Sequence, residues 1–221
     1  MTLGYWKIRG LGSNIRYQLA YSGQQWNAEE YEQGEGPDFS RAEWLDKKFT
    51  LGMDFPNLPY LVDGEFKLTE TLAIHKYLAE KYSPELLGKD LKEKAKVNMV
   101  SGVIGDLKGA ATRPCYATGE KSDITNAMKD RLPPIIKFMG ENKFLVGNDV
   151  TFVDFFFYEL LCLCKMVQGT EEFEKEYPQL VAYMTNVRNL PKLKEYLDGD
   201  CVEKTYIFNN KIAKINGTLA P

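Results

Sequence analysis

The hydrophobic residues of the first 82 positions switch several times between strand spacing and helical spacing. Residues 2–10 begin with an apolar strand, and residues 15–21 carry apolar side chains at helical spacing. Residues 59–68 form two further strands with a tight turn near Asp63-Gly64, and a helix follows over 70–82. With a further strand and helix between residues 21 and 59, the order is β-α-β-α-β-β-α, which predicts a mixed α/β domain.

The remainder of the chain has only helical spacing. The pattern of the first domain stops at Pro84, and helices are predicted at about 91–113, 123–141, 153–167, 179–188 and 192–197. Thr151 and Asp154 form an acidic capping box, and the helix after it is apolar almost all round, so it is a core helix. We therefore expect an α/β domain over 1–83 and an all-α helical bundle over 90–221.

The hairpin and helix over residues 54–71 have the features of a peptide-binding cradle. Pro59 belongs at the start or the edge of a strand, which leaves the backbone of Leu58 extended and free to pair with a bound peptide. The N–H groups that begin the next helix suit a carboxylate, and Glu70 beside them suits an ammonium group. An ordinary hairpin followed by a helix with acidic first-turn residues would give the same pattern.

Composition and charge bear on which classes of function the chain can have. The net charge of −3 and the pI near 5.4 give no support for nucleic-acid binding. No apolar run approaches the length of a membrane span, and the first ten residues lack a signal-peptide core, so we expect a cytoplasmic protein. The four cysteines have no metal-binding spacing, and His75 is the sole histidine. Catalysis would then use tyrosine, carboxylates or a thiol cofactor, without a metal.

Four segments make the pattern specific: residues 3–6 (Leu-Gly-Tyr-Trp), 41–44 (Arg-Ala-Glu-Trp), 48–52 (Lys-Phe-Thr-Leu-Gly) and 54–60 (Asp-Phe-Pro-Asn-Leu-Pro-Tyr). They resemble the mu class of cytosolic glutathione transferases, and the resemblance covers nearly the whole chain. It implies a thioredoxin-like first domain, a helical second domain and glutathione as co-substrate.

The resemblance implies that Tyr5 is catalytic and donates a hydrogen bond to the sulfur of glutathione. A free thiol has a pKa of about 8.5 and is mostly protonated at neutral pH, whereas the thiolate is the nucleophile. A charge-assisted hydrogen bond contributes roughly 1.5–3 kcal/mol, which lowers the thiol pKa by about one to two. A strand tyrosine packed in the core is the alternative interpretation of Tyr5.

The resemblance also implies the other glutathione contacts. Arg41, Trp44 and Lys48 fall on one helical face and would bind the glycine carboxylate. Asp106 would reach the ligand of the neighbouring subunit, although pairing with a nearby lysine is equally compatible with its position. The full implied set is Tyr5, Trp6, Leu11, Arg41, Trp44, Lys48, Asn57, Leu58, Pro59, Glu70, Thr71 and Asp106.

For the electrophile, the resemblance implies a pocket formed by Ile8, Leu11, Tyr116 and Phe208, with Tyr116 as a second catalytic hydroxyl. Phe55 resembles the aromatic residue that a mu-class subunit inserts into its partner, which implies a homodimer. Pro114 should kink or end the helix that precedes Tyr116. Gly109, Thr112, Arg113 and Pro114 also occupy positions where the class usually has larger apolar residues, so we expect a wider or more polar pocket.

The function that the resemblance implies is conjugation of the glutathione thiolate to small hydrophobic electrophiles, a detoxification reaction. A glutathione-dependent isomerase and a non-catalytic ligand-binding or structural protein of the same fold are the alternatives.

Overall fold

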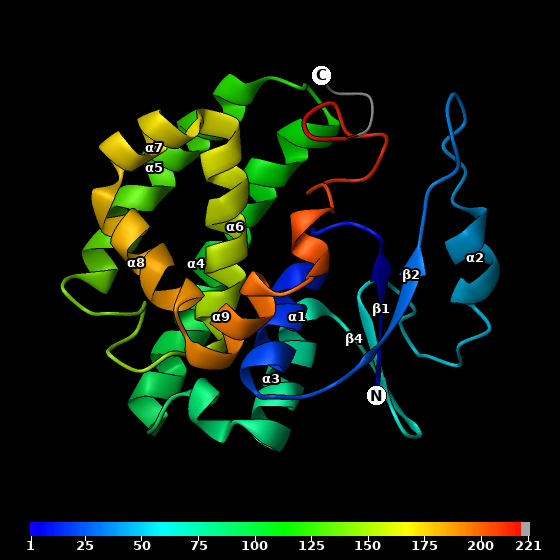
Figure 1. Ribbon diagram of the computed structural model, residues 1–221, viewed down its shortest axis with the longest axis horizontal. Coiled ribbons are helices and arrows are strands. Elements are labelled where there is room, and N and C mark those ends of the chain that lie inside the picture. Colours follow the sequence, from blue (N-terminus) through cyan, green and yellow to red (C-terminus); the bar gives the residue numbers. More distant parts are fainter. Residues whose placement is uncertain (218–221) are drawn as a thin grey trace.

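The first domain contains one four-stranded sheet. The computed structural model describes residues 1–217, and the strands are ordered β2-β1-β3-β4 (Figure 1). β1 (Thr2–Trp6) pairs in parallel with β2 (Asn27–Tyr31) and antiparallel with β3 (Tyr60–Asp63), which forms a hairpin with β4 (Phe66–Thr69). This is the sheet of the predicted α/β thioredoxin-like domain.

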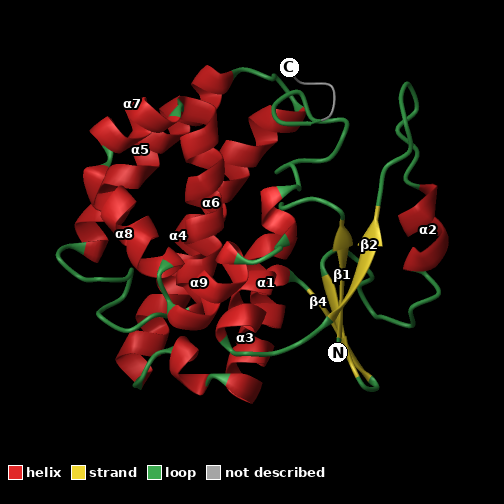
Figure 2. Ribbon diagram, in the orientation of Figure 1, coloured by secondary structure: helices red, strands yellow, loops and turns green. Residues whose placement is uncertain are grey.

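Helices lie on both faces of the sheet, and its inner strands β1 and β3 are more buried than β2 and β4. α1 (Gly12–Tyr21) and α3 (Thr71–Tyr82) lie on the face toward the helical domain, and α2 (Ala42–Lys48) lies on the other side (Figure 2). The hairpin turn is Gly64-Glu65, one residue later than the sequence suggested, because Asp63 still pairs with Phe66. Gly64 has φ +65°, a conformation that favours glycine.

The helical part begins after a 3₁₀ turn at Pro84–Leu87. Its helices are α4 (Leu91–Tyr116), α5 (Lys121–Met139), α6 (Phe152–Gln168), α7 (Thr170–Glu176), α8 (Pro178–Arg188) and α9 (Pro191–Asp198), followed by a second 3₁₀ turn at Val202–Lys204. Short α7 was not predicted.

Pro114 does not end α4, because the helix continues to Tyr116. The proline removes one N–H donor in the last turn of the helix, where little helix remains to be disrupted. Tyr116 therefore keeps a helical position.

The predicted capping box begins α6, the central helix of the bundle. The Thr151 N–H and Oγ1 donate to Asp154 Oδ2 at 2.7 and 2.9 Å, and Oδ1 of the same carboxylate accepts from Leu145 N and Tyr183 Oη at 3.0 Å each. Nearly all of α6 is buried, as its apolar sequence predicted. α1 packs against α6 and α9, which joins the sheet to the bundle.

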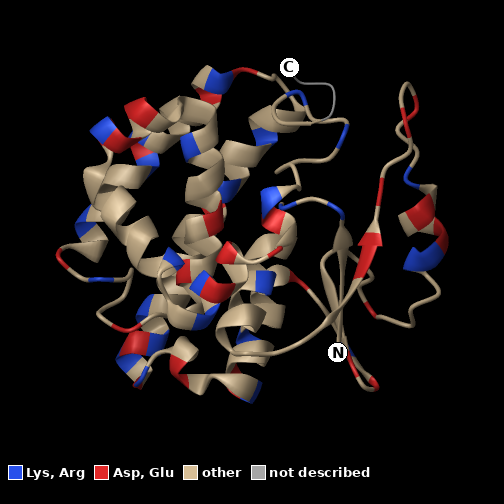
Figure 3. Ribbon diagram, viewed as in Figure 1, with Lys and Arg blue, Asp and Glu red and all other residues tan. Residues whose placement is uncertain are grey.

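Charged residues of both signs are interspersed over the helices (Figure 3). Within residues 1–217, no helix has the length and apolarity needed to cross a membrane.

Candidate active site

Tyr5 lies near the end of β1, an inner strand of the sheet, and its ring belongs to a buried aromatic cluster. Its side chain is 8% exposed. Tyr5 Oη accepts a hydrogen bond of 2.8 Å from the main-chain N–H of Leu11, at the start of α1. The hydroxyl therefore keeps its own proton for a further acceptor.

The surroundings of Tyr5 suit a hydrogen-bond donor. Burial raises the pKa of Tyr5, and the N–H of Leu11 opposes that rise because it stabilises the phenolate. The phenol consequently remains protonated at neutral pH. An accepted hydrogen bond also polarises the O–H group, which makes it a stronger donor.

Aromatic side chains form the wall beside Tyr5. Trp44, from α2, contacts Tyr60 in a stacked arrangement at 6.1 Å between ring centroids and Tyr31 edge-on at 5.2 Å. The same buried cluster contains Tyr5, Ile8, Tyr31, Trp44, Leu58 and Tyr60, and Trp6 and Leu11 pack against it. The structure thus brings together six of the residues predicted for the site: Tyr5, Trp6, Ile8, Leu11, Trp44 and Leu58.

Leu58 and Pro59 form the edge of the predicted cradle. Both are buried, and the peptide bond between them is cis. β3 begins only at Tyr60, and no hydrogen bond within residues 1–217 uses the Leu58 N–H or C=O. These groups are available to pair with an added peptide strand. Asn57, before them, is exposed.

Glu70 is not in the first turn of α3, as the sequence suggested, but is the residue that precedes the helix. Its φ of +72° is unusual for a residue other than glycine, a strain that proteins tend to retain at functional sites. This conformation leaves the Glu70 side chain exposed beside the first N–H groups of α3 and the hydroxyl of Thr71. A carboxylate and an ammonium group on one carbon would suit both features.

Two cations flank α2. Arg41 immediately precedes the helix and is exposed, whereas Lys48 is its last residue and half-buried. Neither makes an ion pair within the described part of the chain, in contrast to Lys47, whose Nζ lies 2.9 Å from Glu29 Oε1. Arg41 and Lys48 are therefore available to bind a ligand carboxylate beside the Trp44 ring.

The C-terminal segment places the second tyrosine. Tyr116, 42% exposed at the end of α4, accepts a hydrogen bond of 2.9 Å from the Asn210 N–H. Phe208 is held nearby, because its C=O accepts from the Gly10 N–H at 3.0 Å. As in Tyr5, the hydroxyl proton of Tyr116 stays available to a ligand. In Figure 1 this segment, drawn in red, lies between the bundle and the strands of the sheet.

Asp106 is exposed although residues beside it in the sequence are apolar. It lies on the exposed face of α4, whereas its neighbours Ile104 and Leu107 face the core. It takes part in none of the ion pairs among residues 1–217, so the predicted alternative, pairing with a nearby lysine, is not observed.

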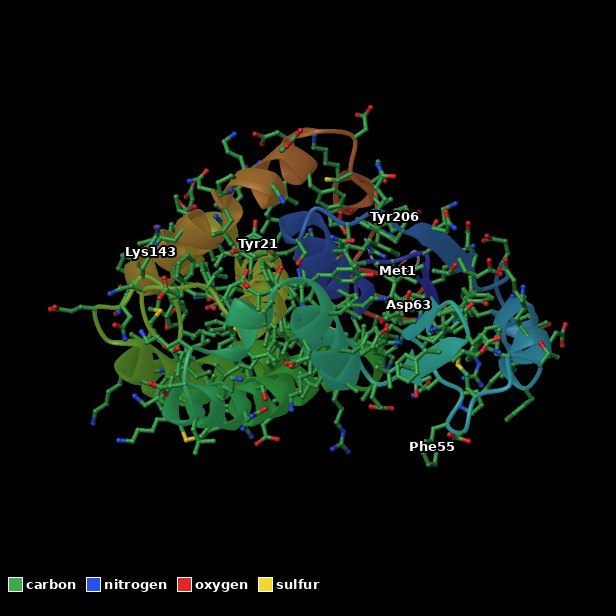
Figure 4. All side chains as sticks on the ribbon, turned by 90° about the horizontal axis from the view of Figure 1, so that it is seen from below. Met1, Tyr21, Phe55, Asp63, Lys143 and Tyr206 are labelled. Carbon is green, nitrogen blue, oxygen red and sulfur yellow. The ribbon has the colours of Figure 1, made fainter. Side chains whose placement is uncertain are left out.

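Phe55 is one of the most exposed large apolar side chains, at 79%. In Figure 4 its ring projects from the edge of the fold into solvent. Phe55 is therefore not a core side chain in the single chain. The loop that carries Phe55 is fixed by Thr69 Oγ1, which donates to the Phe55 carbonyl at 2.9 Å.

Sequence reasoning missed a buried ion pair that supports the site. Arg9 Nε and Nη2 donate to Glu159 Oε1 and Oε2 at 3.0 and 2.7 Å, and Tyr17 Oη donates to Oε2 at 2.8 Å. The guanidinium also lies 4.0 Å from the centroid of the Phe208 ring. A single charged residue in the apolar helix 155–164 was the signal that could have revealed Glu159.

His75, whose role the sequence did not assign, is in a second buried polar group. Its Nε2 lies 2.7 Å from Asn14 Oδ1, and its Nδ1 contacts Gln18 Oε1, while Gln18 Nε2 donates to the His75 carbonyl at 2.9 Å. Burial lowers the pKa of His75 to about 3, so the imidazole is neutral at neutral pH. In the described residues, no group of three or more His, Cys, Asp or Glu side chains could hold a metal ion.

Comparison with protein-family models gives two matches. Residues 1–80 match the N-terminal domain and residues 106–200 the C-terminal domain of glutathione S-transferases. A glutathione S-transferase of Dermatophagoides pteronyssinus is 37% identical over 221 residues, covering 99% of this chain and 98% of the relative.

Relatives of the mu class are similarly close. Glutathione S-transferase Mu 5 of Rattus norvegicus is 37% identical, covering 97% of this chain and 94% of the relative, and Mu 3 of Homo sapiens is 36% identical with the same coverage. Among solved structures, the glutathione S-transferase Blo t 8 superimposes with a TM-score of 0.85 at 30% identity, covering 98% of this chain and 100% of that one.

Proposed function

Since this chain belongs to the glutathione S-transferase family and is an enzyme whose co-substrate is glutathione, we propose that it conjugates the thiolate of glutathione to small hydrophobic electrophiles. Such a reaction would serve detoxification. The observation that carries this proposal is the hydroxyl of Tyr5, which is buried, protonated and already bonded by the Leu11 N–H, so that its proton has one direction left to donate.

Glutathione would bind where β1 ends and where β3 and α3 begin. The Leu58 main chain would pair with the cysteine backbone, Glu70 and the start of α3 at Thr71 would bind the γ-glutamyl end, and Arg41 and Lys48 would bind the glycine carboxylate beside Trp44. Trp6, Leu11, Asn57 and Pro59 would complete the contacts. The Leu58 main chain makes no hydrogen bond, and the Arg41, Lys48 and Glu70 side chains make no ion pair, within residues 1–217.

For the chemical step, the protein would have to ionise the glutathione sulfur and position the electrophile against it. Tyr5 Oη would donate to the sulfur and lower the thiol pKa, because the hydrogen bond is stronger to the thiolate than to the thiol. The sulfur electron pair would then form a bond to the electrophilic carbon, while the leaving group departs or the electrons move onto an oxygen. Tyr116 would donate its proton to such an oxygen.

The electrophile would lie between the two tyrosines. Ile8, Leu11 and Phe208 provide apolar contact there, since all three are buried or half-buried at the junction of the sheet domain and the C-terminal segment. Holding the electrophile against the sulfur supplies the proximity contribution to the rate.

The active unit would be a homodimer. Exposed Phe55 would insert into the partner subunit, and Asp106, exposed and unpaired on α4, would bind the ammonium group of the partner's glutathione. We assign residues 1–83 to the glutathione domain and 90–221 to the helical domain. The four free cysteines support a reducing, cytoplasmic environment.

The test is the ionisation of bound glutathione. Thiolate absorbance in the ultraviolet would be titrated against pH for the wild-type complex and for the Tyr5→Phe complex. We expect the thiol pKa in the wild-type complex to lie about one to two below the free value of about 8.5, and to return toward it in the variant. A thiol pKa in the wild-type complex equal to that of free glutathione would refute the proposed activation.

Turnover separates the remaining alternatives. Conjugation of chlorodinitrobenzene by the wild type, reduced in Tyr5→Phe with glutathione affinity retained, supports a transferase. Isomerisation of a ketosteroid without conjugation would favour the isomerase, and tight binding of apolar dyes with no turnover would favour a binding protein.

A further inference from the structure

A small, partly open cavity lies near Tyr5 where the two domains meet. Its lining includes Gly10 and Asn14 from the sheet domain, Lys108 and Thr112 from α4, Glu159 from α6, and Phe208 from the C-terminal segment. About 20 Å³ is open to the centre of a water molecule, which is room for one water-sized group.

The cavity shares Phe208 with the proposed electrophile pocket, and we take it as the inner end of that pocket. Gly10 separates it from Tyr5 so narrowly that a Cβ atom at Gly10 would come within 2.5 Å of Tyr5 Oη. Thr112 lies one helical turn before Tyr116, and Phe208 belongs both to the cavity and to the proposed pocket. A substituent on a bound electrophile could therefore reach it.

Asn14 presents an unsatisfied amide in this cavity. The side chain is fully buried, and its Nδ2 has no hydrogen-bond partner within residues 1–217. Burial of a polar group without a partner is unfavourable, and a group bound in the cavity would relieve that cost.

The neighbouring imidazole determines which amide atom faces the cavity. Gln18 Nε2 donates to the His75 carbonyl, so Gln18 Oε1 must accept, and the proton of the neutral imidazole is on Nδ1. His75 Nε2 is then an acceptor and requires a donor from Asn14. A half-turn of the Asn14 amide, which exchanges two atoms of nearly equal size, supplies that donor and leaves the carbonyl oxygen unpartnered.

Lys108 supplies the complementary donor. It makes no ion pair in the described part of the chain, and burial lowers the pKa of its ammonium group. The Glu159 carboxylate is already occupied by Arg9 and Tyr17. A ligand carboxylate would be repelled by Glu159 and the Asn14 oxygen, and an ammonium group by Lys108. A hydroxyl can donate to Asn14 and accept from Lys108.

We infer that this cavity is a polar subsite in which Asn14 and Lys108 bind a hydroxyl group of the electrophile, so that the enzyme favours apolar electrophiles carrying a hydroxyl remote from the reacting carbon. This inference rests on the proposed function, because it requires glutathione sulfur beside Tyr5. His75 and Gln18 act as positioning residues, since they orient Asn14 without reaching the ligand.

The test uses binding, so that it does not depend on turnover. Two conjugates of matched shape, S-(4-hydroxymethylbenzyl)glutathione and S-(4-ethylbenzyl)glutathione, would be titrated into the full-length wild-type protein by calorimetry. We expect the hydroxymethyl conjugate to bind about three- to ten-fold more tightly, the effect of one neutral hydrogen bond. Equal affinity, or preference for the ethyl conjugate, would overturn the inference.

Variants locate the effect. Asn14→Leu and Lys108→Met should each reduce the ratio of affinities to about one or below, whereas Lys94→Met, at an exposed position of the same helix, should preserve it. If Asn14→Leu does not fold, Lys108→Met alone decides. A ratio unchanged in Lys108→Met contradicts the inference, as does a crystal structure of the complex in which water remains in the cavity and the hydroxyl points elsewhere.

The two proposals fail differently. If the proposed function is wrong, the pKa of the glutathione thiol in the complex will equal that of free glutathione. If only the subsite is wrong, that pKa will be lowered, but the hydroxymethyl and ethyl conjugates will bind with equal affinity.

Discussion

The Leu11 N–H donates to Tyr5 Oη at 2.8 Å, and this single hydrogen bond determines where the phenol proton can go. The bond connects the end of β1 to the start of α1, so the orientation of the hydroxyl depends on the turn between them. That turn contains Gly10, with φ +41°.

Gly10→Ala should reduce turnover because it displaces the Tyr5 hydroxyl. An added Cβ would lie 2.5 Å from Tyr5 Oη and 3.0 Å from its ring, and alanine is also strained at this φ. We expect kcat for chlorodinitrobenzene to fall about ten-fold or more, the value of a charge-assisted hydrogen bond, with little change in glutathione affinity. Gly102→Ala on α4, where a Cβ meets nothing within 4 Å, is the control and should retain activity. Full activity of Gly10→Ala would show that the geometry of this turn does not affect catalysis.

Glu159→Gln should be strongly destabilising. It leaves the Arg9 guanidinium buried without its bidentate carboxylate, and such a loss typically costs about 3–5 kcal/mol. Urea denaturation would measure the free energy of unfolding. Asp198→Asn removes an exposed ion pair with Arg188 and Lys194 and should change stability little. An equal decrease in the free energy of unfolding in both variants would show that the buried ion pair contributes no more to stability than the exposed one.

His75 should make the protein less stable as pH falls. Its folded pKa of about 3 lies below the unfolded value of about 6.5, so the unfolded chain binds more protons between these values. The free energy of unfolding is therefore expected to fall by about 2 kcal/mol from pH 7 to pH 5.

The control for this pH dependence is His75→Leu, which removes the sole histidine of the chain. This variant should be less stable at every pH, because Asn14 and Gln18 lose their partner, but its stability should decline less between pH 7 and pH 5. Parallel curves for the two proteins would assign the pH dependence to other groups.

Phe55→Ala should dissociate the proposed dimer. The side chain is almost fully exposed in the single chain, and its truncation would remove an apolar anchor from an interface. Sedimentation velocity would give the mass in solution. Leu91→Ala, which truncates an equally exposed side chain at the start of α4, should leave the dimer intact. A monomeric wild type, or a dimeric Phe55→Ala, would contradict the role proposed for Phe55.

Local sequence determined much of this protein. The spacing of apolar residues defined most helices and strands, and Thr151 and Asp154 specified the start of α6 through a capping box that closes over three residues. Tyr5, Trp44 and Leu58 were predicted as neighbours from a family resemblance, and the fold brings them into one buried cluster. Propensity and spacing alone would have left Tyr5 as a core residue.

Only the tertiary structure revealed the polar interior. Arg9 meets Glu159 across 150 positions, His75 meets Gln18 across 57, and Asn14 shares a cavity with Lys108 from the other domain. Local patterns carry no information on such pairs, because each arises from the packing of elements that lie far apart in the sequence, and each partner alone resembles a misplaced polar residue. The same reason explains Asp106, whose apolar neighbours in sequence turned toward the core and left it exposed. Sequence set the elements, and packing decided which buried charges and amides face one another.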